Sequence, residues 1–158
     1  MRVGITGHRG LPEASEALVR EAIREAVQPY AGADLTGVSC IADGPDAWFA
    51  QTVLDLGGRL EVVVPAEEYR DSLPAWHHRT YDELLSRAAE IHATGLARSD
   101  SQAHMTGSEI LVGLVDEVIA VWDGRPARGY GGTADVVRYA REHGVALRVL
   151  WPEGATRD

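Results

Sequence analysis

The chain of 158 residues is 45% hydrophobic and 25% charged, a composition typical of a folded globular domain and unlike that of a disordered segment. Its length fits one domain over residues 1–158, and no apolar run is long enough to cross a bilayer, so we expect no membrane contact. With 15 basic and 24 acidic residues the formal net charge is −9, which argues against nucleic acid as a partner.

Short apolar runs alternate with amphipathic segments along the first half of the chain. Runs that end at glycine, proline or a polar turn predict strands at residues 3–7, 36–42 and 60–65. Between them, apolar residues recur at helical spacing and predict helices over residues 12–28 and 47–56. The first of these strands is expected to be central in the sheet.

The second half continues the alternation. Residues 67–89 are predicted to be mainly helical, and a weak strand follows at residues 91–93. A polar loop that ends near Ser101 is expected to open another helix, which runs to Leu114. The remaining elements are a strand, a helix and a last strand, expected at residues 118–122, 133–143 and 146–151.

This alternation predicts an α/β fold with an open, mostly parallel sheet and helices on both faces, in three layers α/β/α. In such sheets, ligands bind beyond the carboxyl ends of the strands, where the topology reverses. Four loops are expected to meet there, at residues 7–10, 42–46, 97–101 and 123–133.

The last of these loops has the pattern of a phosphate-binding loop. A buried strand is followed by Gly129, Gly131, Gly132 and Thr133, and then by the first turn of a helix. Glycines let backbone N–H groups approach an anion, and the helix N-terminus favours negative charge. A turn that serves only to start the helix is the alternative.

Three motifs resemble one family. They are Gly4-Ile5-Thr6-Gly7-His8-Arg9, Ala42-Asp43-Gly44-Pro45-Asp46 followed by Phe49-Ala50, and Gly131-Gly132-Thr133-Ala134-Asp135. In this order and at these intervals they resemble the SLOG superfamily, which includes LOG-type phosphoribohydrolases, the Rossmann domain of DNA-processing protein A, molybdenum-cofactor carriers and sensors of NAD-derived nucleotides. The resemblance implies a Rossmann-like fold and a nucleotide or nucleotide-sugar ligand.

The chain departs from the phosphoribohydrolases at two positions. Those enzymes place a glutamate three residues after the motif threonine, where this chain has Val136, and an arginine near the start of the preceding helix, where residues 105–109 hold none. Asp135 and Glu109 are the acids nearby that remain as candidates for catalysis. The resemblance therefore implies a ligand sensor or carrier, with a nucleotide N-glycosidase that uses a non-standard acid as the alternative; whether the chain is an enzyme stays open.

DNA-processing protein A has arginines in the region that corresponds to residues 106–109, and this chain lacks them. Together with the charge of −9, their absence leads us to expect a small nucleotide as the partner and to disfavour nucleic acid. An interaction module for DNA processing is the second alternative.

The predicted ligand contacts lie on the strand-end loops. His8 and Arg9 leave the first strand, Asp43 and Asp46 flank a turn at which either also suits a helix cap, and Arg128 is expected to neutralise phosphate charge. The full predicted set is Thr6, Gly7, His8, Arg9, Asp43, Gly44, Asp46, Arg128, Gly129, Tyr130, Gly131, Gly132 and Thr133.

No metal or other cofactor is predicted. His77 and His78 are adjacent on an expected helix, point in different directions and are interpreted as surface histidines. Trp48 is a candidate for stacking on a base. The single Cys40 excludes an internal disulfide and, with no apolar leader evident, favours the cytoplasm. The resemblance and the apolar helix at residues 105–115 suggest a homodimer or tetramer.

Overall fold

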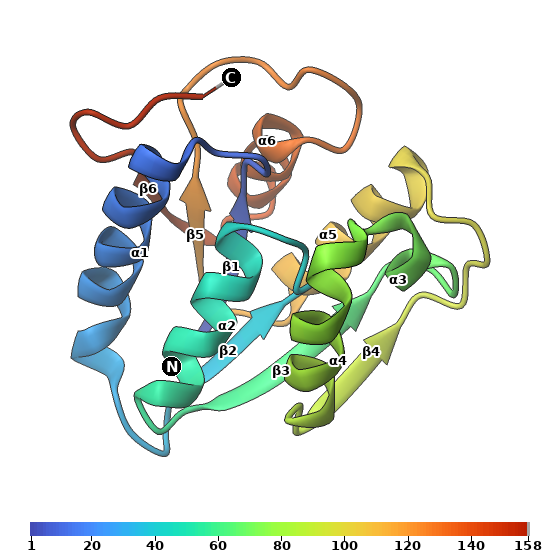
Figure 1. Ribbon diagram of the computed structural model, residues 1–158, viewed down its shortest axis with the longest axis horizontal. Coiled ribbons are helices and arrows are strands. Elements are labelled where there is room, and N and C mark those ends of the chain that lie inside the picture. The colour runs from blue at the N-terminus through green and yellow to red at the C-terminus, as the bar shows by residue number, and fades with distance from the viewer. Residues whose placement is uncertain (158) are drawn as a thin grey trace.

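Six parallel strands form one sheet in the order β4-β3-β2-β1-β5-β6, in a computed structural model that describes residues 1–157 (Figure 1). From β1 the chain moves outward to β4 and then returns to the other side of β1 at β5, so the topology reverses between β1 and β5. The strands are β1 (Arg2–Gly7), β2 (Thr36–Ser39), β3 (Arg59–Val64), β4 (Glu90–Ala93), β5 (Glu117–Val121) and β6 (Ala146–Leu150).

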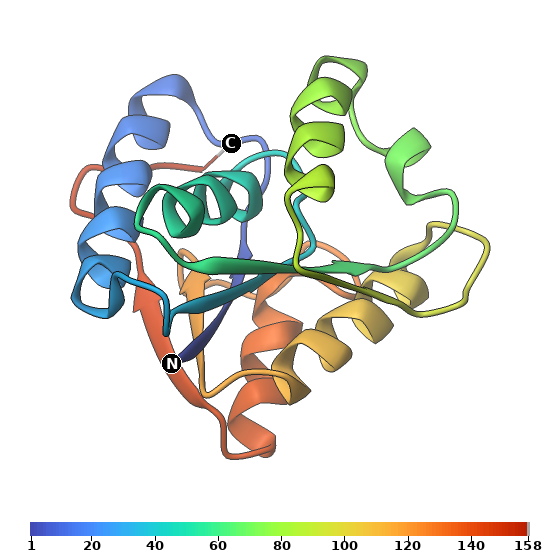
Figure 2. The same cartoon turned by 90° about the horizontal axis from the view of Figure 1, so that it is seen from below.

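Helices cover both faces of the sheet. Figure 2 shows α1, α2 and α4 on one face and α5 and α6 on the other. The predicted three-layer α/β architecture is confirmed, and every strand pair is parallel. The helices are α1 (Glu13–Val27), α2 (Pro45–Asp55), α3 (Tyr69–Ser72), α4 (His78–Ser86), α5 (Ser101–Gly113) and α6 (Thr133–Glu142), with 3₁₀ turns η1 (Gln28–Tyr30) and η2 (Ala75–His77).

The core lies on both sides of the central strands. Between the sheet and α1 and α2, side chains such as Val3, Ile23 and Phe49 are fully buried. Phe49 and Val53 approach the backbone of β2 so closely that a Cβ at Gly37 would lie 2.6 Å from Val53 Cγ2. The absence of a side chain at Gly37 therefore lets α2 lie close to the sheet.

The segment predicted as one mainly helical stretch is divided into α3, η2 and α4. Leu73 is extended, with ψ 155°, because the residue before a proline is restricted to that region, and Pro74 then starts η2. Pro74 was expected to begin the longer helix, and the structure places a 3₁₀ turn before that helix starts at His78.

The exit of β2 differs from the prediction because the strand ends at Ser39, three residues early. Ile41 has a left-handed φ of 47°, a strained conformation for a β-branched residue. Its N–H donates to Ser39 Oγ over 2.9 Å, and its carbonyl accepts from His77 Nε2 over 2.9 Å. The prediction that His77 is a surface residue is therefore wrong: it is 2% exposed and holds this bend.

Candidate functional site

A cavity of about 300 Å³ lies beyond the carboxyl ends of the central strands, at the point where the topology reverses. We call it the crevice. Residues from the exits of β1 and β2, from the N-terminal turns of α5 and from the start of α6 line it together. The predicted site residues that it brings together are Thr6, Gly7, His8, Arg9, Asp46, Gly131, Gly132 and Thr133.

The start of α6 supplies the donors of the crevice. The N–H of Gly131 donates to Asp135 Oδ2 over 2.9 Å, and that of Gly132 donates to the Gly129 carbonyl over 3.3 Å. Both N–H groups are thus used inside the loop. Those of Thr133 and Ala134, the first two residues of α6, have no partner among residues 1–157.

Thr133 itself is oriented toward the crevice. The residue is 7% exposed, and its hydroxyl has no hydrogen-bond partner among the residues that the structure describes. A hydroxyl on the wall of a cavity that bonds no protein group is available to donate to or accept from a ligand.

His8 joins the exits of β1 and β5. Its Nε2 lies 3.1 Å from the backbone N and 3.2 Å from Oδ1 of Asp123, and its own backbone N–H donates to the Val121 carbonyl over 3.1 Å. Burial, and next the Arg157 charge, lower the pKa of His8 below its usual value. Its role in the structure is to hold two loops of the crevice together.

Two arginines face the crevice, each held by a carboxylate. Arg9 contacts Asp43 Oδ1 through Nη2 at 2.6 Å, and Arg157 Nη1 lies 3.6 Å from Asp123 Oδ2. The sequence prediction missed Arg157 because it lies beyond the last strand. Ser15 on α1 positions that segment, since its Oγ donates to the Thr156 carbonyl over 2.9 Å.

The acid on the crevice wall is Asp46, in the first turn of α2. Burial raises its pKa to about 7, against the smaller opposing effects of the Ala42 N–H and the Arg9 charge. Asp46 is therefore a proton-exchanging group near neutral pH. The sequence predicted it as a ligand contact but gave no signal of this shift, which depends on the packing around it.

Several crevice residues lie outside the predicted set of ligand contacts. His104 and Ser108, one turn apart on α5, line the cavity, as do Cys40 and Tyr69. The ring of His104 meets that of Tyr69 edge-on at 5.7 Å, and its pKa is lowered by burial and next by Arg9. The sequence places His104 one helical turn before Ser108, which left open whether His104 faces the ligand or is a half-exposed residue at the helix start.

Other predicted residues lie outside the crevice. Asp43 and Gly44 line an adjoining cavity, Arg128 lines a third with Asp123, and Tyr130 is exposed over the start of α5 and α6. Gly129 contributes only its carbonyl, to the loop.

The two candidate catalytic acids are also elsewhere. Asp135 caps its own loop by accepting from Gly131, forms an ion pair with Arg138 and lines a different cavity from the crevice. Glu109 is half-buried on α5, next to Ser108 of the crevice wall. A carboxylate at the third helical position that bonds back to the preceding loop is a capping arrangement, so its geometry gives Asp135 a structural role.

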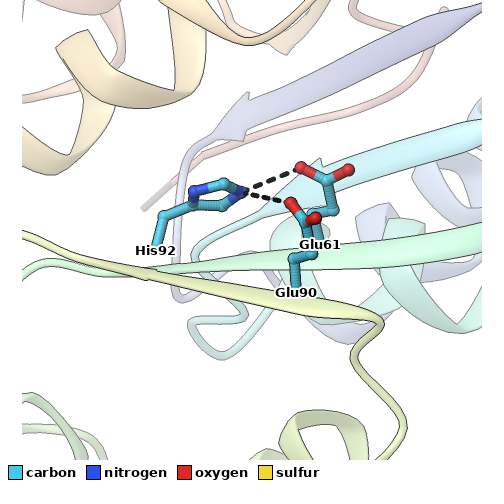
Figure 3. A group of neighbouring side chains, drawn as sticks. All are labelled: Glu61, Glu90 and His92. Atoms are coloured by element: carbon cyan, nitrogen blue, oxygen red, sulfur yellow. Dashed lines mark hydrogen bonds and ion pairs between the residues drawn. The ribbon is translucent and has the colours of Figure 1, made fainter.

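A cluster with metal-ligand chemistry lies near the opposite ends of the strands. Glu61, Glu90 and His92 place three ligand atoms within 4.8 Å of one another on β3 and β4 (Figure 3). Arg2, however, already binds both Glu61 oxygens, at 3.0 and 2.8 Å, and His92 Nε2 lies 2.9 Å from Glu61 Oε1. A cation would have to compete with the guanidinium, so we interpret the cluster as an ion-pair network.

This network predicts an acid-sensitive contribution to stability. The hydrogen bond from Arg2 holds the pKa of Glu61 below its usual value, so the stabilisation is present above the unfolded pKa of about 4.3 and is lost as the pH falls below it. Glu61→Gln should lower the free energy of unfolding at pH 7 by about 1–2 kcal/mol. In this variant the free energy of unfolding should also decrease less as the pH is lowered. Denaturant unfolding across this pH range measures both, with Asp82→Asn, in the exposed Arg70 pair, as the control. If the free energy of unfolding decreases equally with falling pH in Glu61→Gln and in the unmodified chain, the stabilising role of this ion-pair network is wrong.

The comparisons with known proteins concern the fold. Neither a protein-family model nor a curated protein sequence matches the chain. Among solved structures, DNA processing protein A from Helicobacter pylori matches with a TM-score of 0.72 and 17% identity over 99% of this chain. The same protein from Streptococcus pneumoniae matches with a TM-score of 0.68 and 19% identity over 97%, and the molybdenum cofactor carrier protein of Chlamydomonas reinhardtii with 0.55 and 14% over 94%.

These proteins share one fold class with the chain. The chain has the Rossmann-like α/β fold of these proteins. The resemblance drawn from the sequence motifs is confirmed at the level of the fold, although the chain spans only 68% of the Helicobacter protein, 51% of the Streptococcus protein and 74% of the carrier. At these identities the shared fold carries no assignment of ligand or reaction.

One prediction about partners is wrong. The net charge led us to disfavour nucleic acid, but a protein with the same fold, DNA processing protein A from Helicobacter pylori, binds single-stranded DNA. The charge of the whole chain was a poor guide because nucleic-acid binding depends on the local charge where the strand lies, and Arg9 and Arg157 share one cavity here. In residues 1–157, no helix has both the length and the apolar character to span a membrane.

Proposed function

We propose that the chain binds the phosphate of a nucleotide or nucleotide sugar in the crevice and acts as a ligand sensor or carrier. The observation that carries the proposal is Thr133, which lines the same cavity as Arg9 and Arg157 and whose hydroxyl and N–H have no partner among residues 1–157. An N-terminal helix dipole, two free N–H groups, a hydroxyl and two guanidinium groups are the donors that a phosphate requires.

The size of the crevice supports a ligand of the dimensions of one nucleotide. About 300 Å³ lies at the lower end of the range for small-molecule sites, which runs from roughly 300 to 1,000 Å³. Asp46, Tyr69 and His104 also line the crevice and supply polar groups suited to hydroxyls of a sugar. Location in the cytoplasm and assembly into a dimer or tetramer remain predictions.

A second candidate is binding of a single DNA strand in the same crevice. It is favoured by the likeness in fold to DNA processing protein A from Helicobacter pylori, whose single-stranded DNA binding is described. The chemistry at the crevice is shared, because a strand also presents phosphates to arginines and helix N-termini. A strong dependence of affinity on salt would distinguish the strand from a mononucleotide.

The N-glycosidase alternative gains no support from Asp135, which is bound to its own loop. If base release from nucleoside monophosphates is detected, the acid available on the crevice wall is Asp46. Loss of that release in Asp46→Asn, with Asp135→Asn retaining it, would identify the group.

Thr133→Val tests the proposal with the least disturbance, because valine keeps the shape of threonine and removes the hydroxyl. We expect affinity for AMP, ADP-ribose or ribose 5-phosphate, measured by calorimetric titration, to fall about tenfold. Thr106→Val, on α5 with its hydroxyl bonded to the Gln102 carbonyl and not lining the crevice, serves as the control. Absence of binding by the unmodified chain at millimolar concentrations of all three ligands would overturn the proposal.

The raised pKa of Asp46 gives a pH dependence to this binding. Below about pH 7 the side chain is neutral, and above it the carboxylate repels a phosphate in the same cavity. Affinity for AMP should therefore fall as the pH rises through about 7, and Asp46→Asn should remove the part of that fall that titration of the phosphate itself does not explain. Titrations of both chains at several pH values measure the difference; identical profiles would contradict this role.

A further inference from the structure

A second cavity adjoins the crevice and is larger, at about 570 Å³. It lies on the face of the sheet that α1 and α2 cover side by side (Figures 1 and 2). The two cavities share a wall, since Arg9 lines the crevice, Asp43 lines the second cavity, and the two side chains form an ion pair. A ligand held at this wall has access to both sides.

Two tryptophans line the second cavity, which we call the indole cavity. Trp76, in η2, is 75% exposed, an unusual placement for so large an apolar side chain. Trp48, on α2, is half-buried, and the guanidinium of Arg20 lies 4.8 Å from its ring centre. Exposed indoles at the wall of a cavity are suited to stack on a flat heteroaromatic ring.

The charges of the indole cavity select against phosphate. Glu13 and Glu16, from the first turn of α1, line it together with Asp43. Arg20 binds Glu16 at 3.0 Å and Arg9 binds Asp43, but the exposed Glu13 has no ion-pair or hydrogen-bond partner among residues 1–157. Carboxylates repel anions and accept N–H groups, so the surroundings suit a neutral ring that carries N–H donors.

We propose that the indole cavity binds a nucleobase, stacked on the indoles and with its amino group toward Glu13. This inference rests on the proposed function in one respect: the crevice then holds the phosphate, and the Arg9–Asp43 pair lies between phosphate and base. The base comes either from a mononucleotide or from a nucleotide within a single strand, and both present the same chemistry to the cavity.

The test compares probes that carry the base, the phosphate or both. Calorimetric titrations use adenosine, ribose 5-phosphate, AMP and a short oligodeoxyadenylate. Trp76→Ala should lower the affinity for adenosine and AMP about tenfold, because base stacking is lost. The affinity for ribose 5-phosphate should stay unchanged, because the crevice is intact. Ile91→Ala, at a similarly exposed apolar residue on β4, is the control and should change nothing. Glu13→Gln should weaken adenosine about threefold without affecting ribose 5-phosphate.

The outcomes separate the two proposals. If Trp76→Ala and the unmodified chain bind every probe that carries a base with equal affinity, the proposed base site in the indole cavity is wrong. The proposed function still holds in that case if Thr133→Val weakens the binding of ribose 5-phosphate. Adenosine binding lost in Trp76→Ala, without any binding of ribose 5-phosphate, supports the base site and overturns the phosphate site. If Trp76→Ala weakens the binding of the oligodeoxyadenylate and of no other probe, the base site is supported and the base comes from a nucleotide within a single strand. Absence of binding by all four probes at millimolar concentrations overturns both.

Discussion

Replacement of Gly131 by alanine is expected to reduce the affinity for AMP or ribose 5-phosphate by at least about tenfold. Gly131 has a left-handed φ of 84°, and a Cβ there would lie 2.9 Å from the backbone carbonyl oxygen of Ser101, at the start of α5. Because that oxygen belongs to a helix and cannot move alone, the loop must shift, and the free N–H groups of Thr133 and Ala134 shift with it. Calorimetric titration measures the loss.

The same loop supplies a matched control for this substitution. Gly124 has a nearly identical φ of 83°, but a Cβ there would have nothing within 4 Å. Gly124→Ala therefore introduces the backbone strain without the clash and is expected to leave ligand affinity unchanged. Equal losses in the two variants would show that the effect arises from strain in the loop, and the assigned position of the phosphate would be wrong.

Phe49→Ala is expected to give the largest loss of stability, about 3–5 kcal/mol in the free energy of unfolding. The ring is fully buried between α2 and the sheet, and it packs against Gly37 of β2, where no side chain is present to fill the space left behind. Denaturant unfolding followed by circular dichroism measures the change. Leu18→Ala, at a residue 38% exposed on α1, should cost less than about 1 kcal/mol. A loss of under about 1 kcal/mol for Phe49→Ala would contradict the packing described here.

The order of the elements was predictable because several strands and helices end near a glycine or proline and have a simple hydrophobic period. α1 and α6 illustrate this, since their apolar faces are regular and they end near Pro29 and Gly144. The segment around Pro74 was harder to predict, because the apolar Trp76 is exposed and the polar His77 is buried, and the burial of His77 depends on its tertiary contact with Ile41.

The location of the site was also predictable, since the carboxyl ends of parallel strands meet where the topology reverses. The roles of individual side chains were harder to predict from sequence. The carboxylate of Asp135 bonds its own loop, and Arg157 reaches the crevice only because Ser15 holds the C-terminal segment across α1. Such roles depend on contacts between residues far apart in the sequence or on a side-chain rotamer. Local motifs contain neither.

The prediction from net charge that nucleic acid is disfavoured as a partner was wrong for a related reason. A sum of −9 describes long-range attraction, but the charges near the crevice and the indole cavity are arranged locally: Arg9 and Arg157 face one, and Glu13 and Glu16 face the other. If the base and phosphate sites are both correct, this separation of charge would orient a nucleotide across the Arg9–Asp43 pair.

The most direct test of phosphate binding at the start of α6 follows the backbone amides by nuclear magnetic resonance while ribose 5-phosphate is added. The amide signals of Thr133 and Ala134 should show the largest shifts, because their N–H groups are the free donors of the crevice, and Thr133→Val should weaken the response. If the largest shifts fall elsewhere, or if no amide of α6 responds at millimolar ligand, the crevice is not a phosphate site.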